Sequence, residues 1–131
     1  MEGGETMKLT AFATTIGAFV LLLGILGLIS GEGRMMGEMN IDIVLDISRI
    51  ALGGFLVYAG LQSAELSRTA LMTFGIAYLG MFLVGLLDPT LLGLAPSGLG
   101  TIDQILHLGG GIAGVTLPYL IHEHKREGAL I

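Results

Sequence analysis

Two stripes of ionisable residues lie inside long apolar segments of this chain, and any chemistry has to be sought there. In the later stripe a carboxylate, an imidazole and two glycines fall at i, i+4, i+7 and i+11, along one side of a helix. The earlier stripe holds two carboxylates, a guanidinium and a glycine at the same offsets. Ionisable groups in membrane-length apolar segments are costly and therefore indicate a functional site. The stripes consist of Asp103, His107, Gly110 and Gly114, and of Asp42, Asp46, Arg49 and Gly53.

These side chains offer ion pairing, ligand binding or proton transfer. Asp46 and Arg49 at i, i+3 can pair within one helix, and Asp103 and His107 can do so at i, i+4. Such pairs can simply tie helices together, since polar contacts between membrane helices contribute about 0.6–2 kcal/mol. A histidine can also carry a proton near neutral pH, and carboxylates beside a guanidinium can form a ligand or ion pocket. The residues leave the structural and the binding alternatives open.

Several other chemistries are disfavoured by residue type. The chain has no Cys, which excludes disulfides, thiolate metal sites and cysteine catalysis. One His lies inside an apolar segment, so paired His ligands for a haem are lacking and no cofactor is expected. His122 and His124 point to different sides of a helix, so no metal site is expected. The sequence carries no nucleophile triad, Walker loop or dinucleotide fingerprint, and we expect a protein that is not an enzyme.

The composition indicates a membrane protein. Of the 131 residues 53% are hydrophobic and 13% are charged, and the mean hydropathy is +0.84. A soluble domain has about 25% charged residues. The 22 glycines fall inside apolar runs, where small residues let helices approach closely in lipid. The net charge of −5 excludes nucleic acid as a partner. The expected partners are the lipid bilayer and either a second copy of the chain or another membrane protein.

Four apolar segments organise the single transmembrane domain expected over residues 1–131. Each has about 20 residues, the length that spans a bilayer as a helix. Their connections are short, so neighbouring helices must be antiparallel and the fold class is all-α, an integral membrane four-helix bundle. The first segment has an acidic flank and no small-residue cleavage site, which favours a retained span over a signal peptide. The predicted spans are 9–29, 41–61, 69–87 and 102–121, joined by connections at 30–40, 62–68 and 88–101.

The last connection is unusual because it is apolar, contains two prolines and has no charge after Asp88. One interpretation is a loop that lies in the headgroup region of the bilayer. The other is a short re-entrant lid over the mouth of the bundle. The sequence does not choose between them.

The two halves of the chain resemble each other, which predicts two repeated helical hairpins. Residues of the first span recur in the third, and residues of the second recur in the fourth. A duplicated two-helix unit keeps its orientation, so the halves should be related by an axis along the membrane normal. The matches include Thr15 and Thr73, Gly17 and Gly75, Asp42 and Asp103, Gly53 and Gly114, and Tyr58 and Tyr119.

The repeat would place the two polar stripes opposite each other at the outer ends of their helices. At 1.5 Å per residue, Arg49 lies about 12 Å and His107 about 8 Å into the membrane. A cation at that depth needs partners, so we expect Arg49 to bond Asp46, with Asp103 or His107 reaching it from the last span. Asp42 completes this predicted polar cluster.

The glycines of the same stripes are predicted to serve helix packing. Gly110 and Gly114 form a small-xxx-small motif, which lets two helix backbones approach closely. Gly53 holds the equivalent place on the second span. The motif can act inside the bundle or at a contact between two copies of the chain.

The stretch Asp103-Gln104-Ile105-Leu106-His107 at the start of the last span, together with Gly85-Leu86 closing the third, resembles the prokaryotic membrane family called domain of unknown function 4383. The likeness covers about residues 12–118 and implies a four-span membrane protein without an assigned activity. In that family the second span usually carries Asn-x-x-His, whereas this chain has Asp46-Ile47-Ser48-Arg49. The resemblance therefore implies the fold and the polar pairs rather than an activity.

Two functions fit these observations. The first is a structural or accessory membrane protein whose polar cluster fixes the register of the helices. The second is a small transporter or channel-like subunit that uses the cluster as a ligand, ion or proton site. They differ in one physical property, because a working site needs a route for water or ligand, whereas a structural cluster can be sealed inside a packed bundle.

The Lys and Arg residues that flank the spans predict the topology. Four of them lie on the side of the termini and one, Arg34, on the other side, so both termini should be cytoplasmic in a multi-pass protein of the cell membrane. Single-cysteine variants near Arg34 and Ser97 should react with an impermeant thiol reagent added outside, and those near Ser67 should be protected. Labelling near Ser67 from outside would reverse the assignment. The four residues are Lys8, Arg68, Lys125 and Arg126.

Overall fold

The computed structural model describes the backbone of residues 2–31, 34–35 and 39–130 and the side chains of residues 8–31 and 40–121. Within this part the chain forms four helices, and each contains a stretch long and apolar enough to cross a membrane. The fold is therefore the predicted all-α bundle. The elements are α1 (Glu2–Ser30), β1 (Arg34–Met35), β2 (Met39–Asn40), α2 (Ile43–Gln62), α3 (Ala64–Leu87) and α4 (Thr101–Leu130).

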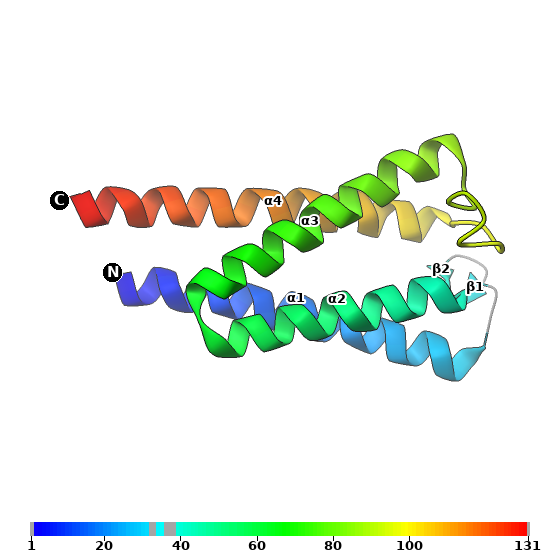
Figure 1. Cartoon of the computed structure of the whole chain (residues 1–131), viewed down its shortest axis with the longest axis horizontal. Coiled ribbons are helices and arrows are strands. Elements are labelled where there is room, and N and C mark those ends of the chain that lie inside the picture. The colour runs from blue at the N-terminus through cyan, green and yellow to red at the C-terminus, as the bar shows by residue number, and fades with distance from the viewer. Residues whose placement is uncertain (1, 32–33, 36–38, 131) are drawn as a thin grey trace.

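Successive helices run antiparallel, so both termini lie at one end of the bundle (Figure 1). We call this the termini end. The opposite end, the loop end, carries the connection 88–100 and the antiparallel pair β1–β2, in which Arg34 pairs with Asn40. α1 packs mainly against α2, and α3 mainly against α4. The architecture is thus two helical hairpins, in which each helix packs more extensively on its hairpin partner than on any helix of the other hairpin. The side chains of Arg34, His122, His124, Lys125 and Arg126, on which predictions were made, lie outside the described residues.

The second and third helices are joined by a single residue, Ser63, instead of the connection predicted at 62–68. α3 therefore begins well before the predicted span 69–87. The Ser63 hydroxyl accepts a hydrogen bond from the Leu66 N–H at 3.1 Å, which caps the helix. The Ser67 hydroxyl donates to a carbonyl near the end of α2 at 3.1 Å. The predicted span began only where the residues become continuously apolar. The polar residues at 65, 67 and 68 already belong to the first turns of α3, and the sequence prediction had assigned them to the connection.

The position of Ser67 changes the design of the labelling experiment. Ser67 is fully buried between the two helices, whereas Glu65 on the same turn is exposed. A cysteine at Glu65 therefore tests the same side of the membrane without opening the core.

Glycines set the distance between the helices of each hairpin. A Cβ atom built on Gly53 would lie 2.5 Å from a backbone nitrogen of α1 and 2.8 Å from the Gly17 carbonyl oxygen. In the second hairpin, a Cβ on Gly114 would lie 2.7 Å from the Gly75 Cα atom. The contact between Gly17 and Gly53 thus has a counterpart between Gly75 and Gly114, at positions that the proposed repeat aligns. This correspondence supports the repeat, which stays a prediction.

The small-xxx-small motif of α4 faces the interior of the bundle. A Cβ on Gly110 would lie 3.0 Å from the ring of Tyr78 and 3.3 Å from the ring of Phe74, both on α3. A Cβ on the adjacent Gly109 would meet nothing within 4 Å. Gly110 and Gly114 therefore serve the packing of α4 against α3 in this bundle.

The connection 88–100 folds over the loop end. The Asp88 carboxylate accepts hydrogen bonds from the Thr90 hydroxyl at 2.7 Å and the Thr90 N–H at 3.0 Å. These bonds lower the pKa of Asp88 below its usual value. Leu91 and Leu92 then adopt the left-handed backbone conformation, with φ of 52° and 62°, which turns the chain back toward the bundle. Some apolar side chains of the loop are buried there, whereas Leu92 and Leu94 are 80% and 57% exposed, so the headgroup loop and the re-entrant lid both stay predictions. The buried residues are Leu91, Ala95 and Leu99, which pack with Leu45 of α2.

Gly53→Ala should destabilise the protein by about 1–3 kcal/mol, because its methyl group would meet backbone atoms of α1 that cannot rotate away. Gly54→Ala is the matched control, since a Cβ there meets nothing within 4 Å. Alanine also favours a helix over glycine by about 1 kcal/mol. Thermal midpoints of the two variants in one detergent check the expectation. Equal midpoints would mean that α1 and α2 do not approach at Gly53.

Candidate functional site

The five residues predicted to form a polar cluster lie together inside the loop end. Their helices turn these side chains inward because the opposite faces carry large apolar residues, such as Ile47 and Ile105, which are 54% and 63% exposed. The helical spacing of the stripes therefore identified the inner face of α2 and α4. The exposed fractions are 0% for Asp46, 1% for Asp103, 3% for His107 and 4% for Asp42 and Arg49.

Arg49 forms two buried ion pairs, one within α2 and one that joins the two hairpins. Its Nη1 donates to Asp46 Oδ1 at 2.9 Å, one turn earlier on α2. Its Nη2 donates to Asp103 Oδ1 at 3.2 Å on α4. Water and salt screen such buried pairs far less than surface pairs. The geometry follows the expectation that Arg49 faces the interior, bonds Asp46 and is reached from the fourth helix.

Asp103 connects three segments of the chain. Its Oδ2 accepts hydrogen bonds from the backbone N–H groups of Asn40 and Gly100, both at 2.7 Å. Its Oδ1 accepts from Arg49. Hydrogen bonds to an ionised carboxylate are about twice as strong as neutral ones. The start of α4, the end of β2 and the end of the connection 88–100 are thus held by one side chain.

Asn40 and Ser97 belong to the cluster but were not predicted. The Asn40 Oδ1 accepts a hydrogen bond from the Asp42 N–H at 2.8 Å, an Asx turn that leads into α2. The Asn40 amide donates to Asp42 Oδ2 at 3.0 Å and to the Gly98 carbonyl at 2.8 Å. The N–H and the hydroxyl of Ser97 both donate to Asp42 at 2.7 Å. The Asn-Ile-Asp pattern at 40–42 is typical of an Asx turn and could have been recognised in the sequence. The residues around Ser97 contain no pattern that predicts its contact with Asp42.

His107 lies one turn deeper than Asp103, and in the described part of the chain no hydrogen bond joins the two, although their spacing allows one. The His107 Nδ1 has no hydrogen-bond partner among the described residues, and neither has Asp46 Oδ2. The His107 ring instead meets the Tyr78 ring edge-on, with centroids 5.0 Å apart and planes at 75°. Tyr78 in turn packs on Phe74 at 4.2 Å. Asp46 Oδ2 and His107 Nδ1 are therefore the two buried atoms of the cluster that could still accept or donate a hydrogen bond.

Three cavities of the bundle lie elsewhere. One of about 340 Å³ lies between α2, α3 and the loop, one of about 340 Å³ between α3 and α4 at the termini end, and one of about 130 Å³ between α1, α3 and α4. None of these three is lined by Asp42, Asp46, Arg49, Asp103 or His107. Among the described residues no group of three or more His, Cys, Asp or Glu side chains could hold a metal ion.

Fold and site together define a class: a small α-helical membrane protein with four candidate spans and a polar cluster buried under a loop. The family model described as Domain of unknown function (DUF4383) matches residues 10–120, and the chain belongs to this family. The resemblance seen in the sequence is thereby confirmed. No curated protein and no solved structure matches the chain. The motif residues Asp103 and His107 both lie in the buried cluster.

Asp103→Ala should lower the stability more than Asp46→Ala. Loss of Asp103 removes an ion pair of Arg49 and leaves the N–H groups of Asn40 and Gly100 without their acceptor, whereas loss of Asp46 leaves Arg49 paired with Asp103. Removing one partner of a buried pair costs about 3–5 kcal/mol, and each orphaned donor adds about 1–3 kcal/mol. Asp103→Asn, which keeps an acceptor oxygen, should recover part of the loss. Denaturation of all three variants in one detergent measures this, and equal losses for Asp46→Ala and Asp103→Ala would contradict it.

Proposed function

We propose that this membrane protein has a structural or accessory role and that its polar cluster locks the loop end of the bundle. One observation carries the proposal: the carboxylates of Asp42 and Asp103 are occupied by donors of the protein itself. Asp103 accepts two backbone N–H groups and Arg49, and Asp42 accepts the Asn40 amide and two donors of Ser97. Groups saturated in this way have little capacity left for a ligand.

The cluster is well suited to fix helix register. Asn40 and Asp103 are 63 residues apart in the chain, Ser97 and Asp42 are 55 apart, and Arg49 and Asp103 are 54 apart. A slip of α4 by one turn, about 5.4 Å, would separate the ion pair and leave charges buried without partners. Because such a separation costs several kcal/mol, the observed register is strongly favoured over its neighbours.

We infer that the protein is not an enzyme. The Ser97 hydroxyl donates to the carboxylate of Asp42, which is a weak base compared with the imidazole that usually activates a serine nucleophile. The carboxylates of Asp46 and Asp103 are engaged by Arg49. An ion-paired carboxylate is a poor general base, because deprotonating a substrate would cost it the ion pair.

The setting that we propose is the cell membrane, with both termini cytoplasmic. Large apolar residues such as Leu87 and Leu61 are 90% and 71% exposed on the bundle surface. Such a surface requires lipid or another apolar partner. A second copy of the chain or a different membrane protein could share this surface with lipid, and the accessory role proposed above includes either one.

A second candidate function is a small transporter or channel-like subunit that uses the cluster as a ligand, ion or proton site. The observation in its favour is that Asp46 Oδ2 and His107 Nδ1 are buried without a partner among the described residues. Carboxylates and imidazoles inside membranes are the groups from which proton relays are built. This function requires that water reach His107.

Water access to His107 separates the two functions. In His107→Cys, a water-soluble thiol reagent should react at least about a hundredfold more slowly than in Leu94→Cys, because opening a sealed bundle by about 3 kcal/mol must precede the reaction. Leu94 is 57% exposed on the connection 88–100 and serves as the reference. The chain has no other Cys. Both variants should react fully once denatured. Similar rates in proteoliposomes, from either side, would contradict the structural role and favour the transporter.

A further inference from the structure

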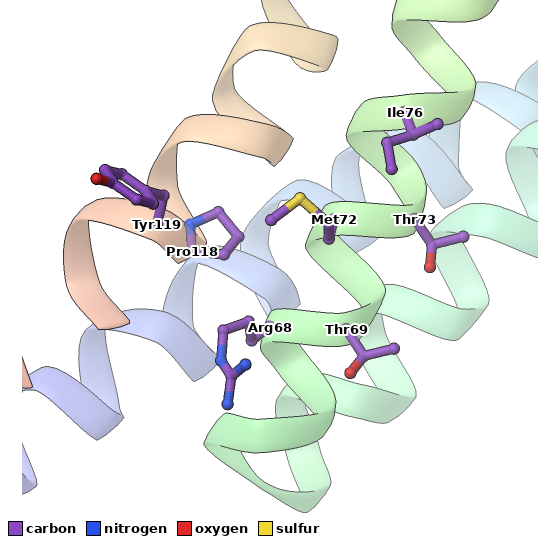
Figure 2. A pocket seen from close by; sticks show the side chains of 7 residues that line it. All are labelled: Arg68, Thr69, Met72, Thr73, Ile76, Pro118 and Tyr119. Carbon is purple, nitrogen blue, oxygen red and sulfur yellow. The ribbon is translucent and has the colours of Figure 1, made fainter. Parts of the chain in front are cut away.

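A groove at the termini end, far from the polar cluster, combines a cation with an apolar wall. It lies between α3 and α4 and has a volume of about 340 Å³ (Figure 2). We propose that this groove binds an anionic phospholipid, with the phosphate at Arg68 and an acyl chain along the apolar wall. The groove is lined by Arg68, Thr69, Met72, Thr73 and Ile76 of α3 and by Pro118 and Tyr119 of α4.

Arg68 supplies the positive charge. Its side chain extends from the first turns of α3 toward the side of α4 (Figure 2) and is half-buried. Among the described residues Arg68 forms no ion pair, although Glu65 lies one turn earlier on the same helix. Arg49, by contrast, is paired with two carboxylates. A guanidinium can bind a phosphate through two parallel hydrogen bonds, so Arg68 has the chemistry to hold a phosphodiester.

Two hydroxyl groups also line the groove. Thr69 and Thr73 are one helical turn apart on α3, and both are exposed where they line the groove (Figure 2). No hydrogen bond within the described residues engages either hydroxyl. A threonine hydroxyl can donate to a phosphate oxygen. The groove therefore offers one cation, and its two neutral donors come from another side of α3 (Figure 2).

The remainder of the groove is apolar, and its charged and apolar parts follow the same order as the headgroup and acyl chain of a lipid. Met72, Ile76 and the fully buried Pro118 form its wall. Ile76 is two turns further along α3 than Arg68, about 12 Å deeper into the span at 1.5 Å per residue. Tyr119, an aromatic residue typical of the membrane interface, lies at the edge of the groove. The groove thus has a charge near the membrane interface and an apolar surface toward the bilayer centre. This order matches a phospholipid, whereas a free phosphate would not contact the apolar surface.

A second cavity of the same size provides a comparison within the molecule. The cavity between α2, α3 and the loop is also about 340 Å³, but its lining includes Met81, Val84 and Leu92 and no charged residue. It can accommodate an acyl chain without distinguishing one headgroup from another. The selectivity for an anionic headgroup is thus assigned to the groove at Arg68.

Native mass spectrometry of the full chain in detergent tests the proposal, with phosphatidylglycerol and phosphatidylcholine of equal acyl chains as the two probes. The wild type should bind phosphatidylglycerol about tenfold more tightly, because the choline cation of phosphatidylcholine neutralises its phosphodiester and repels Arg68, whereas phosphatidylglycerol keeps a net negative charge; tenfold corresponds to about 1.4 kcal/mol. Arg68→Gln should remove this preference. Lys8→Gln is the matched control, because it removes a cation at the same end but outside the groove, and it should change the affinity by less than about threefold.

Three results would overturn the site. Equal affinity of the wild type for both lipids would mean that the headgroup is not recognised. Equal losses in Arg68→Gln and Lys8→Gln would mean general charge attraction. Displacement of phosphatidylglycerol by millimolar glycerol phosphate would mean that the groove binds a soluble phosphate. If Arg68→Gln does not fold, Arg68→Lys keeps the charge but loses the two parallel donors of the guanidinium, and it should weaken phosphatidylglycerol binding by about threefold or more; unchanged binding would contradict recognition by the guanidinium.

Discussion

The buried ion pair between Arg49 and Asp103 links the two hairpins of this protein at the loop end. Within each hairpin, glycine lets the backbones touch, and the contact is extensive. Between the hairpins the contact is spread over several pairs of helices, each less extensive than the pairs within a hairpin, and among the described residues Arg49–Asp103 is the ion pair that crosses from one hairpin to the other. The same carboxylate holds the backbone at Asn40 and Gly100. The folds of the loop and of the chain before α2 therefore depend on where this pair forms.

The sequence was sufficient for the features that depend on helical periodicity. The number of spans and the inward faces of α2 and α4 follow from apolar residues at a period of 3.6 and from the cost of a charge in lipid. The contacts of Asn40 and Ser97 could not be predicted in this way, because they join segments that are 63 and 55 residues apart in the chain. His107 had the spacing to pair with Asp103, but the oxygens of Asp103 are engaged by a guanidinium and two backbone N–H groups. Spacing shows which pairs can form, and competition among donors decides which do.

The two ends of the bundle differ in chemistry. At the loop end, Arg49 pairs with Asp103, and Asp42 accepts hydrogen bonds from Asn40 and Ser97. The connection 88–100 lies over these buried groups. At the termini end, Arg68 stands in an open groove without an ion pair among the described residues. One end is thus closed and internally bonded, while the other presents its polar groups to the surroundings.

The pairing of Asp46 with Arg49 inside one helix also bears on how the chain enters the membrane during synthesis. The two charges are three residues apart on α2 and cancel each other without help from any later segment. The first hairpin can therefore insert while the second is still on the ribosome, because α2 does not carry an isolated cation into the lipid. Asp103 reaches Arg49 when α4 arrives, at the end of its helix nearest the water. Assembly can then proceed as insertion of two hairpins followed by their docking.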